Sequence, residues 1–387
     1  MKTLAERAYF DWNATAPLRE EARAAMSAAL AFTGNASSVH AEGRAVRRLI
    51  EKAREQVAQL LRADAKNVIF TSGATEANML ALTPALEIAG RKESRDRLFV
   101  SAIEHPSVRA GGRFPRESIE TLPVTGDGLV DLAALALAVK KAARPLVSVM
   151  LANNETGVVQ PIAQIADIVH AASGVLHVDA VQGAGKIDCD IAALGADLVS
   201  ISSHKLGGPQ GAGALVRRGD IHVAEPLMKG GGQERGQRAG TENVAAIAGF
   251  GAAAAAATLT ETERVAAMRD RLEQGLRRVT PHVRIFGDRG TRLPNTTLFA
   301  VPGVKAETAI IAFDLNGIAV SSGSACSSGK VQPSEVLAAM GVDAALARGA
   351  IRASIGPSTT EAEIDRFVET WNTVAGSLLK ERSGVAA

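Results

Sequence analysis

A lysine stands where an apolar run gives way to turn residues, in the stretch Ser202-Ser203-His204-Lys205-Leu206-Gly207-Gly208-Pro209. Taken alone, a lysine at the end of a strand is most often a solvated surface residue. The serines, the histidine and the glycines around Lys205 favour a partly desolvated pocket instead, where the pKa of its amine would fall. A lysine in such a pocket is suited to Schiff-base chemistry with a carbonyl compound.

A carboxylate ends a second apolar run as Asp179, in His177-Val178-Asp179-Ala180-Val181-Gln182. An aspartate in this place is often only the cap of the next helix. It could also lie in the crevice at the carboxyl ends of the strands, where open α/β sheets bind ligands. Asp179 and Lys205 are about one strand–helix–strand step apart and could lie at neighbouring strand ends. An enzyme that uses pyridoxal phosphate needs this pair, because lysine holds the cofactor and an acid keeps its pyridine nitrogen protonated.

A third stretch, Thr71-Ser72-Gly73-Ala74-Thr75-Glu76-Ala77-Asn78, follows an apolar run and opens a helical pattern. Main-chain N–H groups at a helix N-terminus, together with the Thr75 hydroxyl, form an anion site. On its own this is an ordinary capped helix start. Beside Lys205 and Asp179 it predicts where the phosphate of a cofactor would lie.

The chain has only two cysteines, Cys189 and Cys326. They cannot form a disulfide framework, and without a CxxC or Cys/His cluster we expect no metal site. Serines and glycines surround Cys326, which predicts an exposed loop whose thiol could act as a nucleophile near a cationic cofactor site. Cys189 stands between two aspartates that would disfavour its thiolate, so we interpret it as structural.

The overall charge points away from polyanionic partners. Over 387 residues, 43 basic side chains stand against 41 acidic ones, for a formal net charge of +2. We therefore expect neither nucleic acid nor a membrane surface as a partner. The N-terminus has no apolar region typical of a secretory signal, and no uncharged apolar run reaches spanning length, so the expected location is the cytoplasm.

Elements that could position these residues alternate along the first two-thirds of the chain, which predicts an α/β sheet with helices on both faces. The expected strands are Val68–Thr71, Leu98–Ser101, Leu146–Met150, Val175–Val178, Leu198–Ile201 and Gly213–Val216. The last two would form an antiparallel hairpin in a mostly parallel, mixed sheet. Expected helices include Ser38–Arg62, Ile162–Ala172 and Ile191–Leu194.

The last third of the chain is richer in short strands. The alanine run Ala252–Ala257 is expected to continue through Leu259–Val279 as one long connecting helix. Beyond it we expect strands at Val283–Phe286, Thr297–Ala300, Ile318–Ser321 and Ile351–Ile355, and a helix at Glu361–Leu379. These predict a large domain over residues 15–259 and a smaller α+β domain formed by 1–14 and 260–387, which would carry the Cys326 loop.

Several motifs occur in the order found in enzymes of the class V aminotransferase fold: Thr71–Asn78, Glu104–Val108, Asn153–Gly157, His177–Gln182 and Ser203–Lys205. Two more, Arg235–Asn243 and Ser321–Gly329, narrow the resemblance to cysteine desulfurases of the NifS/IscS type, from about Tyr9 to Trp371. The resemblance implies a pyridoxal-phosphate-dependent transferase of fold type I. It also implies conversion of L-cysteine to L-alanine, with the sulfur passed to an enzyme cysteine as a persulfide for iron–sulfur clusters or other sulfur-containing products.

The resemblance also implies roles for matching residues around the cofactor ring. Lys205 would hold the cofactor and then carry protons, Asp179 would pair with the pyridine nitrogen, and His105 would stack on the ring and assist proton transfer. Gln182 and Asn154 would approach the ring hydroxyl, and Asn154 would also touch the substrate carboxylate.

Further roles follow for the phosphate and the substrate. The expected phosphate ligands are Ala74, Thr75, Ser202 and His204, and Thr241 would reach the phosphate of the neighbouring subunit in a homodimer. Arg352 would hold the substrate carboxylate, since a guanidinium fork suits that group; without the resemblance, it reads as a surface charge at a strand end. Cys326 would attack the substrate sulfur and pass it to an acceptor protein.

Other functions stay open on the same scaffold, namely a selenocysteine lyase, another carbon–sulfur lyase and an aminotransferase. A non-catalytic protein of a sulfur pathway is disfavoured, because Lys205, Asp179 and Cys326 are all present. The sequence ends soon after its last expected helix, where housekeeping members continue into a tail that docks their scaffold. Docking to such a scaffold therefore stays an open question.

Overall fold

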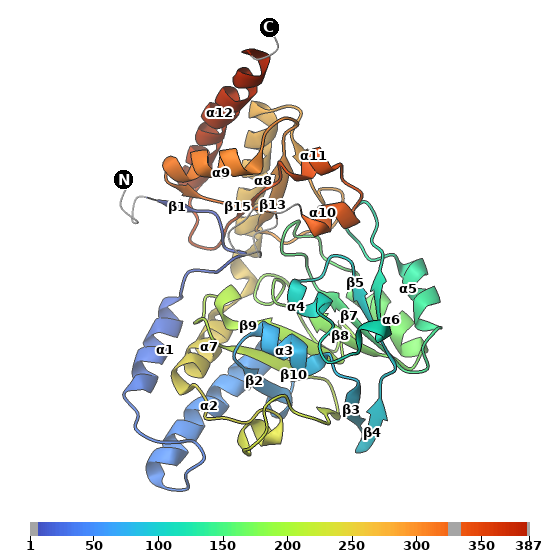
Figure 1. Ribbon diagram of the computed structural model, residues 1–387. Coiled ribbons are helices and arrows are strands. Elements are labelled where there is room, and N and C mark those ends of the chain that lie inside the picture. The colour runs from blue at the N-terminus through green and yellow to red at the C-terminus, as the bar shows by residue number, and fades with distance from the viewer. Residues whose placement is uncertain (1–6, 324–333, 385–387) are drawn as a thin grey trace.

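The larger sheet sets the geometry of this protein, whose computed structural model describes residues 7–323 and 334–384 (Figure 1). Its seven strands run in the order β2-β10-β9-β8-β7-β5-β6. Their bounds are β2 Val68–Thr71, β5 Arg97–Ser101, β6 Ile119–Leu122, β7 Pro145–Met150, β8 Val175–Asp179, β9 Leu198–Ser202 and β10 Gly213–Arg217. Strands β5 to β9 are parallel, and β10 is antiparallel to both β9 and β2, which confirms the mixed sheet and its hairpin.

Both faces of this sheet are covered, because its strands are apolar on both sides. On one face, Val147, Leu176 and Val199 pack against helices α2 (Ala41–Leu60), α5 (Leu132–Val139), α6 (Ile162–Ala171) and α7 (Val244–Ala256). On the other, Leu146 and Leu198 join a second cluster with α3 (Ala74–Ala81). Three polar side chains inside the sheet, Ser148, His177 and Ser200, are buried and bond one another across β7, β8 and β9. Helix α1 (Glu20–Leu30) packs along α7 beside this layer.

A smaller sheet lies above the larger one in Figure 1, with order β12-β13-β16-β15. Its strands are β12 Arg284–Ile285, β13 Thr296–Ala300, β15 Ser321–Ser322 and β16 Ile351–Ser354, and all neighbours are antiparallel. Helices α8 (Thr262–Val279), α9 (Ala306–Leu315) and α12 (Glu361–Gly384) surround it, and short α10 (Glu335–Ala339) and α11 (Ala344–Ala347) follow. The rings of Phe10 and Phe367 pack in a tilted arrangement with centroids 4.8 Å apart, so the N-terminal segment packs with this part of the chain.

Shorter elements complete the described fold. Strand β1 (Ala8–Tyr9) pairs with β14 (Ile318–Ala319), and β3 (Ala85–Ile88), β4 (Arg91–Ser94) and β11 (Ile221–Val223) form a three-stranded sheet. Helix α4 is Pro106–Arg109. The domain boundaries at residues 15 and 260 stay a prediction.

Two helix predictions are wrong. Helices α7 and α8 are separate and meet at 48°, because Ala257 and Thr258 leave helical geometry and the Thr258 hydroxyl bonds that of Thr260 at 2.8 Å. Threonine hydroxyls at such a place compete with helical hydrogen bonds. The run Ile191–Leu194 forms a single turn, capped by Asp190 and ended by Gly195 at φ +66°, and is too short for a helix.

Membrane-spanning character depends on the length and hydropathy of the helices in the described chain. None of its helices is by itself both long and apolar enough to cross a bilayer, and only the bent pair Val244–Ala256 with Leu259–Val279 meets that measure jointly.

Candidate active site

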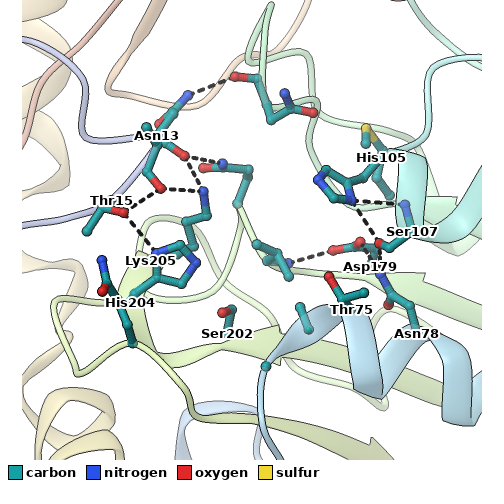
Figure 2. A pocket seen from close by; sticks show the side chains of 18 of the residues that line it. Asn13, Thr15, Thr75, Asn78, His105, Ser107, Asp179, Ser202, His204 and Lys205 are labelled. Carbon is teal, nitrogen blue, oxygen red and sulfur yellow. Dashed lines mark hydrogen bonds between the residues drawn. The ribbon is translucent and has the colours of Figure 1, made fainter. Parts of the chain in front are cut away.

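A cavity of about 500 Å³ opens at the carboxyl ends of β8 and β9, below the smaller sheet (Figure 2). The registers of β7, β8 and β9 bring Met150, Asp179 and Ser200 side by side, so the strand ends meet at one edge. The expected site residues that line the cavity are Ala74, Thr75, His105, Asn154, Asp179, Gln182, Ser202, His204, Lys205 and Arg352.

Lys205 enters the cavity from the 3₁₀ turn Ser203–Lys205 that directly follows β9. Its Nζ donates hydrogen bonds to the main-chain oxygens of Asn13 (2.5 Å) and Ala14 (2.8 Å). The turn is closed by the hairpin to β10, where Ser203 N–H donates to Ala212 O at 3.1 Å. The Lys205 amine therefore rests on neutral carbonyl groups of the N-terminal segment.

Asp179 is buried at the end of β8, on the opposite side of the cavity from Lys205 in Figure 2. Its carboxylate accepts from Asn78 Nδ2 (2.9 Å) and from the main-chain N–H of Val181 (3.1 Å). Asn78 Nδ2 also donates to Ser107 Oγ at 2.9 Å. Asn78 and Ser107 were not singled out from the sequence, although both lie inside the quoted motifs.

His105 caps helix α4 and faces the same side of the cavity as Asp179. Ser107 N–H donates to His105 Nδ1 at 3.2 Å, so the neutral ring carries its proton on Nε2. Burial lowers the pKa of His105; Asp179 opposes that shift and Lys205 adds to it. The imidazole is therefore uncharged at neutral pH, which is compatible with stacking on an aromatic ring.

The far end of the cavity has the features of an anion site. Ala74 and Thr75 open helix α3, and main-chain N–H groups of a first helical turn can bind a phosphate. The main chain comes close here, since a Cβ on Gly213 would lie 2.6 Å from the carbonyl carbon of Gly73. Burial, and then the charge of Lys205, lower the pKa of His204 to about 4.

Arg352 lies in strand β16, and its side chain is 2% exposed, so it is not a surface charge at a strand end. Its Nη2 donates to Asp11 Oδ1 (2.7 Å) and its Nη1 to the main-chain oxygen of Asn154 (3.0 Å). Asp11 in turn accepts from Ser321 Oγ at 2.9 Å. Within the described chain, Arg352 Nε has no hydrogen-bond partner.

Two further residues at the site, Asn13 and Lys186, were not predicted from the sequence. Asn13 is buried, and its main-chain oxygen also accepts from Gln182 Nε2 at 2.9 Å. Lys186 Nζ donates to Gln182 Oε1 at 2.7 Å and to Asn13 Oδ1 at 3.2 Å. Neither residue belongs to a motif that suggests chemistry, and their proximity arises only from folding.

Two predicted site residues are not placed in the cavity. Cys326 lies outside the described residues. Thr241 is exposed and lines a neighbouring hollow that shares Ser72, Gly211 and Ala212 with the cavity. The segment before Thr241 is tied down by Arg54 and Glu234, whose Nη1 and Oε2 are 2.6 Å apart.

Cys189 is buried, and its Sγ donates to Ile187 O at 3.3 Å. Burial, and then Asp188, raise the pKa of this thiol to about 12, which confirms its structural interpretation. Among the described residues, no cluster of three His, Cys, Asp or Glu side chains could hold a metal ion.

The donor set of the cavity fits pyridoxal phosphate. A carboxylate lies on one side for the ring nitrogen, a neutral imidazole lies beside it, and a helix start offers N–H donors for the phosphate. An amine on the opposite side is available for the aldehyde carbon. The close contact between Gly213 and Gly73 leaves no room for a side chain in this wall of the cradle.

Known proteins share this fold and sequence. Residues 8–367 match the aminotransferase class-V family. The chain is 42% identical over 379 residues to a cysteine desulfurase of Cereibacter sphaeroides, covering 96% of this chain and 97% of that protein. It is 40% identical over 386 residues to cysteine desulfurase IscS of Dictyoglomus turgidum, covering 95% of this chain and 96% of that protein.

Solved structures agree with these matches. A NifS-like protein from Rickettsia africae superposes with a TM-score of 0.86 at 35% identity, covering 96% of this chain and all of that one. The protein SspA, solved in complex with cysteine, superposes with a TM-score of 0.76 at 28% identity, covering 91% of this chain and 100% of that one.

Proposed function

Since the chain belongs to the aminotransferase class-V family and, within it, to the cysteine desulfurases, we propose that it converts L-cysteine to L-alanine and transfers the sulfur to its own Cys326. The observation that carries this proposal is the single cavity that brings Lys205, Asp179 and Arg352 together. These are the groups that such a reaction needs for the cofactor and for the substrate carboxylate.

The residues that would hold pyridoxal phosphate come from several elements. Asp179 would hold the ring nitrogen, His105 the ring face, and Gln182 and Asn154 the ring hydroxyl. The phosphate would lie between Ala74 and Thr75 at the start of α3 and Ser202 and His204 at the end of β9 and in the turn after it. When bound, the cofactor withdraws electrons from the substrate Cα and so stabilises the carbanion that forms there.

Lys205 and Arg352 act on the amino acid itself. Arg352 binds the substrate carboxylate, while Asp11 and Asn154 O keep the guanidinium in place. The Lys205 amine removes the proton from Cα. The main-chain oxygens of Asn13 and Ala14 accept hydrogen bonds from this amine and so fix its position at the cavity.

Sulfur transfer is the step that defines the enzyme. The Cys326 thiolate attacks the substrate sulfur and forms an S–S bond, while the Cβ–S bond breaks and its electron pair stays with carbon. Protonation of that carbon gives the methyl group of alanine. The persulfide on Cys326 then passes to an acceptor thiol by exchange.

We propose in addition that the protein works as a homodimer. Thr241 lies just outside the cavity of its own chain, on a segment held by Arg54 and Glu234, and so could reach the phosphate of the neighbouring subunit. The names of IscS relatives support a role in supplying sulfur to an acceptor protein, for iron–sulfur clusters or other sulfur-containing products.

The decisive experiment compares two cysteine variants. Cys326→Ala is expected to lower alanine formation from L-cysteine at least about 100-fold, the scale of a lost nucleophile, while the absorbance of bound cofactor is unchanged. Cys189→Ala is the matched control and keeps activity, since that thiol is buried. Mass mapping after cysteine addition is expected to place the persulfide on Cys326.

Other results would favour the alternatives. Full alanine formation by Cys326→Ala would indicate another carbon–sulfur lyase or a selenocysteine lyase. Alanine that appears only with a keto acid would indicate an aminotransferase. A persulfide on Cys189 alone would contradict the assignment of Cys326 as the residue that accepts sulfur. A wild-type protein that binds no cofactor would contradict the proposal that it is a pyridoxal-phosphate-dependent enzyme.

A further inference from the structure

A second lysine, Lys186, lies beside the cavity and has no part in the steps above. It lines a separate interdomain cavity of about 230 Å³ that also contacts Lys205. Its Nζ lies 2.7 Å from Gln182 Oε1 and 3.2 Å from Asn13 Oδ1. Lys186 thus contacts both residues through their side-chain oxygens.

The first contact joins Lys186 to the side-chain amide of Gln182. The orientation is set at the other end of the amide, where the Asn13 carbonyl can only accept a hydrogen bond, so Gln182 Oε1 is the atom that faces Lys186 Nζ. The opposite end of the amide meets the Asn13 carbonyl at 2.9 Å, where only an N–H fits. One hydrogen of Gln182 Nε2 then remains for a ligand in the cavity that Gln182 lines.

The second contact reaches the residue on which Lys205 rests. Asn13 Oδ1 accepts from Lys186 and from Asn295 Nδ2 (3.0 Å), while Asn13 O accepts from Lys205 and Gln182. The hydrogen bonds from Lys186 and Asn295 to the Asn13 side chain therefore fix the position of the Asn13 main-chain carbonyl. A substitution at Lys186 would shift this carbonyl and so alter the position of the Lys205 amine.

We propose that Lys186 is a positioning residue of the cofactor site, which orients Gln182 toward the ring hydroxyl and holds Asn13 under the Lys205 amine. This inference rests on the function proposed above, because it needs the ring oxygen of pyridoxal phosphate near Gln182. Lys186 itself touches neither substrate nor cofactor.

The electrostatic surroundings agree with this role. Burial, and then the charges of Lys205 and Arg352, together lower the pKa of Lys186 to about 7. Lys186 donates hydrogen bonds in either protonation state, so it can orient Gln182 across the neutral range. Where it is protonated, its charge adds to those of the nearby Lys205 and Arg352.

The test uses the absorbance of bound cofactor, which needs no turnover. Removing the amine in Lys186→Met weakens the N–H donor to the ring oxygen, which becomes more basic. The measured quantity is the pH at which the absorbance of bound cofactor is halfway through its change with pH. This midpoint is therefore expected to rise by about 0.5 unit, where one unit corresponds to 1.36 kcal/mol. Lys186→Arg keeps a charged donor and is expected to restore the midpoint.

Matched variants separate positioning from general damage. Lys141→Met removes an exposed lysine that pairs with Glu120 and is expected to leave the midpoint unchanged. Gln182→Leu is expected to raise the midpoint as Lys186→Met does, and the double variant no further than either alone, because both act through one amide. If Lys186→Met does not fold, Lys186→Gln replaces it, since its shorter side chain loses both contacts.

Two outcomes would overturn the inference: a midpoint equal to that of the wild type in the Lys186 variant, or shifts that add in the double variant. Both leave the proposed function intact, because the wild type would still bind cofactor and form alanine. A wild-type protein without either property would contradict the proposed function itself.

Discussion

Lys205 and Arg352 are both cations that reach the same cavity, one from the larger sheet and one from the smaller. The amine of Lys205 rests on the carbonyls of Asn13 and Ala14, whereas the guanidinium of Arg352 meets the carboxylate of Asp11. A carboxylate beside an amine would favour its charged form. A guanidinium keeps its charge in any case, so the anion only orients it.

The hydrogen-bond partners of Lys205 and Arg352 therefore differ in the way that their proposed roles require. Lys205 must give up and accept a proton, and uncharged main-chain carbonyls accept hydrogen bonds from its amine. Arg352 must keep its charge and its direction, and its surroundings supply one anion and one carbonyl. Changes at either residue, or at the partners that distinguish them, test this contrast.

The largest effect is expected for Lys205→Ala. Loss of the amine removes both the cofactor attachment and the group that moves the Cα proton, so alanine formation is expected to fall by about 10²- to 10⁴-fold or more. Lys141→Ala, at an exposed ion pair, is the control and keeps wild-type activity. Turnover that persists in Lys205→Ala would remove the amine from the mechanism.

Arg352→Lys is expected to have the next largest effect. The charge is kept, but the two-pronged geometry that matches a carboxylate is lost. The KM for L-cysteine is expected to rise about tenfold to 100-fold, at 1.4 kcal/mol for each factor of ten, with a smaller change in kcat. Steady-state kinetics would check this, and an unchanged KM would mean that another group holds the carboxylate.

Asp11→Ala tests the anion that distinguishes Arg352 from Lys205. It leaves a buried guanidinium without its charged partner and is expected to cost about 1–3 kcal/mol of unfolding free energy in denaturant titrations. Asp365→Ala removes an exposed partner of Arg271 and should cost less than about 1 kcal/mol. Equal losses in the two variants would show that burial of the Arg352 pair adds nothing.

Glu155→Gln tests a second carboxyl near Arg352 through pH. Burial raises the pKa of Glu155 from 4.5 to about 7, although Ser334 (2.5 Å) and Arg352 favour its ionised form. Between these values the folded state holds a proton that the unfolded state has released, so stability is lost as pH rises from about 4.5 to about 7.

The glutamine variant lacks this titration. Between pH 5 and pH 8, the wild type is therefore expected to lose about 2.5 kcal/mol more unfolding free energy than Glu155→Gln. The buried Glu104, whose pKa burial raises to about 8, is present in both proteins and cancels in the comparison. Parallel stability curves for the two proteins would mean that Glu155 is ionised throughout.

Much of the fold followed from local patterns. The strand runs ending at Asp179 and before Lys205 were predicted, because short runs rich in Val, Leu and Ile between turn residues are typical of strands buried on both faces. Strand β6 was missed, since Ile119–Leu122 has two polar residues between two apolar ones and shows neither an alternating pattern nor an apolar run. The break between α7 and α8 was missed because the alanine run before it and the helical pattern after it give no local signal that Ala257 and Thr258 leave helical geometry.

The site divides in the same way. Lys205 and Asp179 could be found from the sequence, because each stands at the end of an apolar run, where side chains meet ligands. Asn13 and Lys186 could not, since nothing around them differs from a loop and a turn. Their contacts join positions far apart in the chain, such as Asn13 with Lys205 and Asp11 with Arg352.

The amino-acid sequence by itself determined the kind of chemistry, through the residue types at strand ends and the motifs shared with cysteine desulfurases. Only the tertiary structure decided how each group is tuned. A pKa and a hydrogen-bond direction depend on which partners lie within a few ångströms and on how much water is excluded. Those conditions arise when the N-terminal segment folds between the two sheets, and no local stretch of sequence contains them.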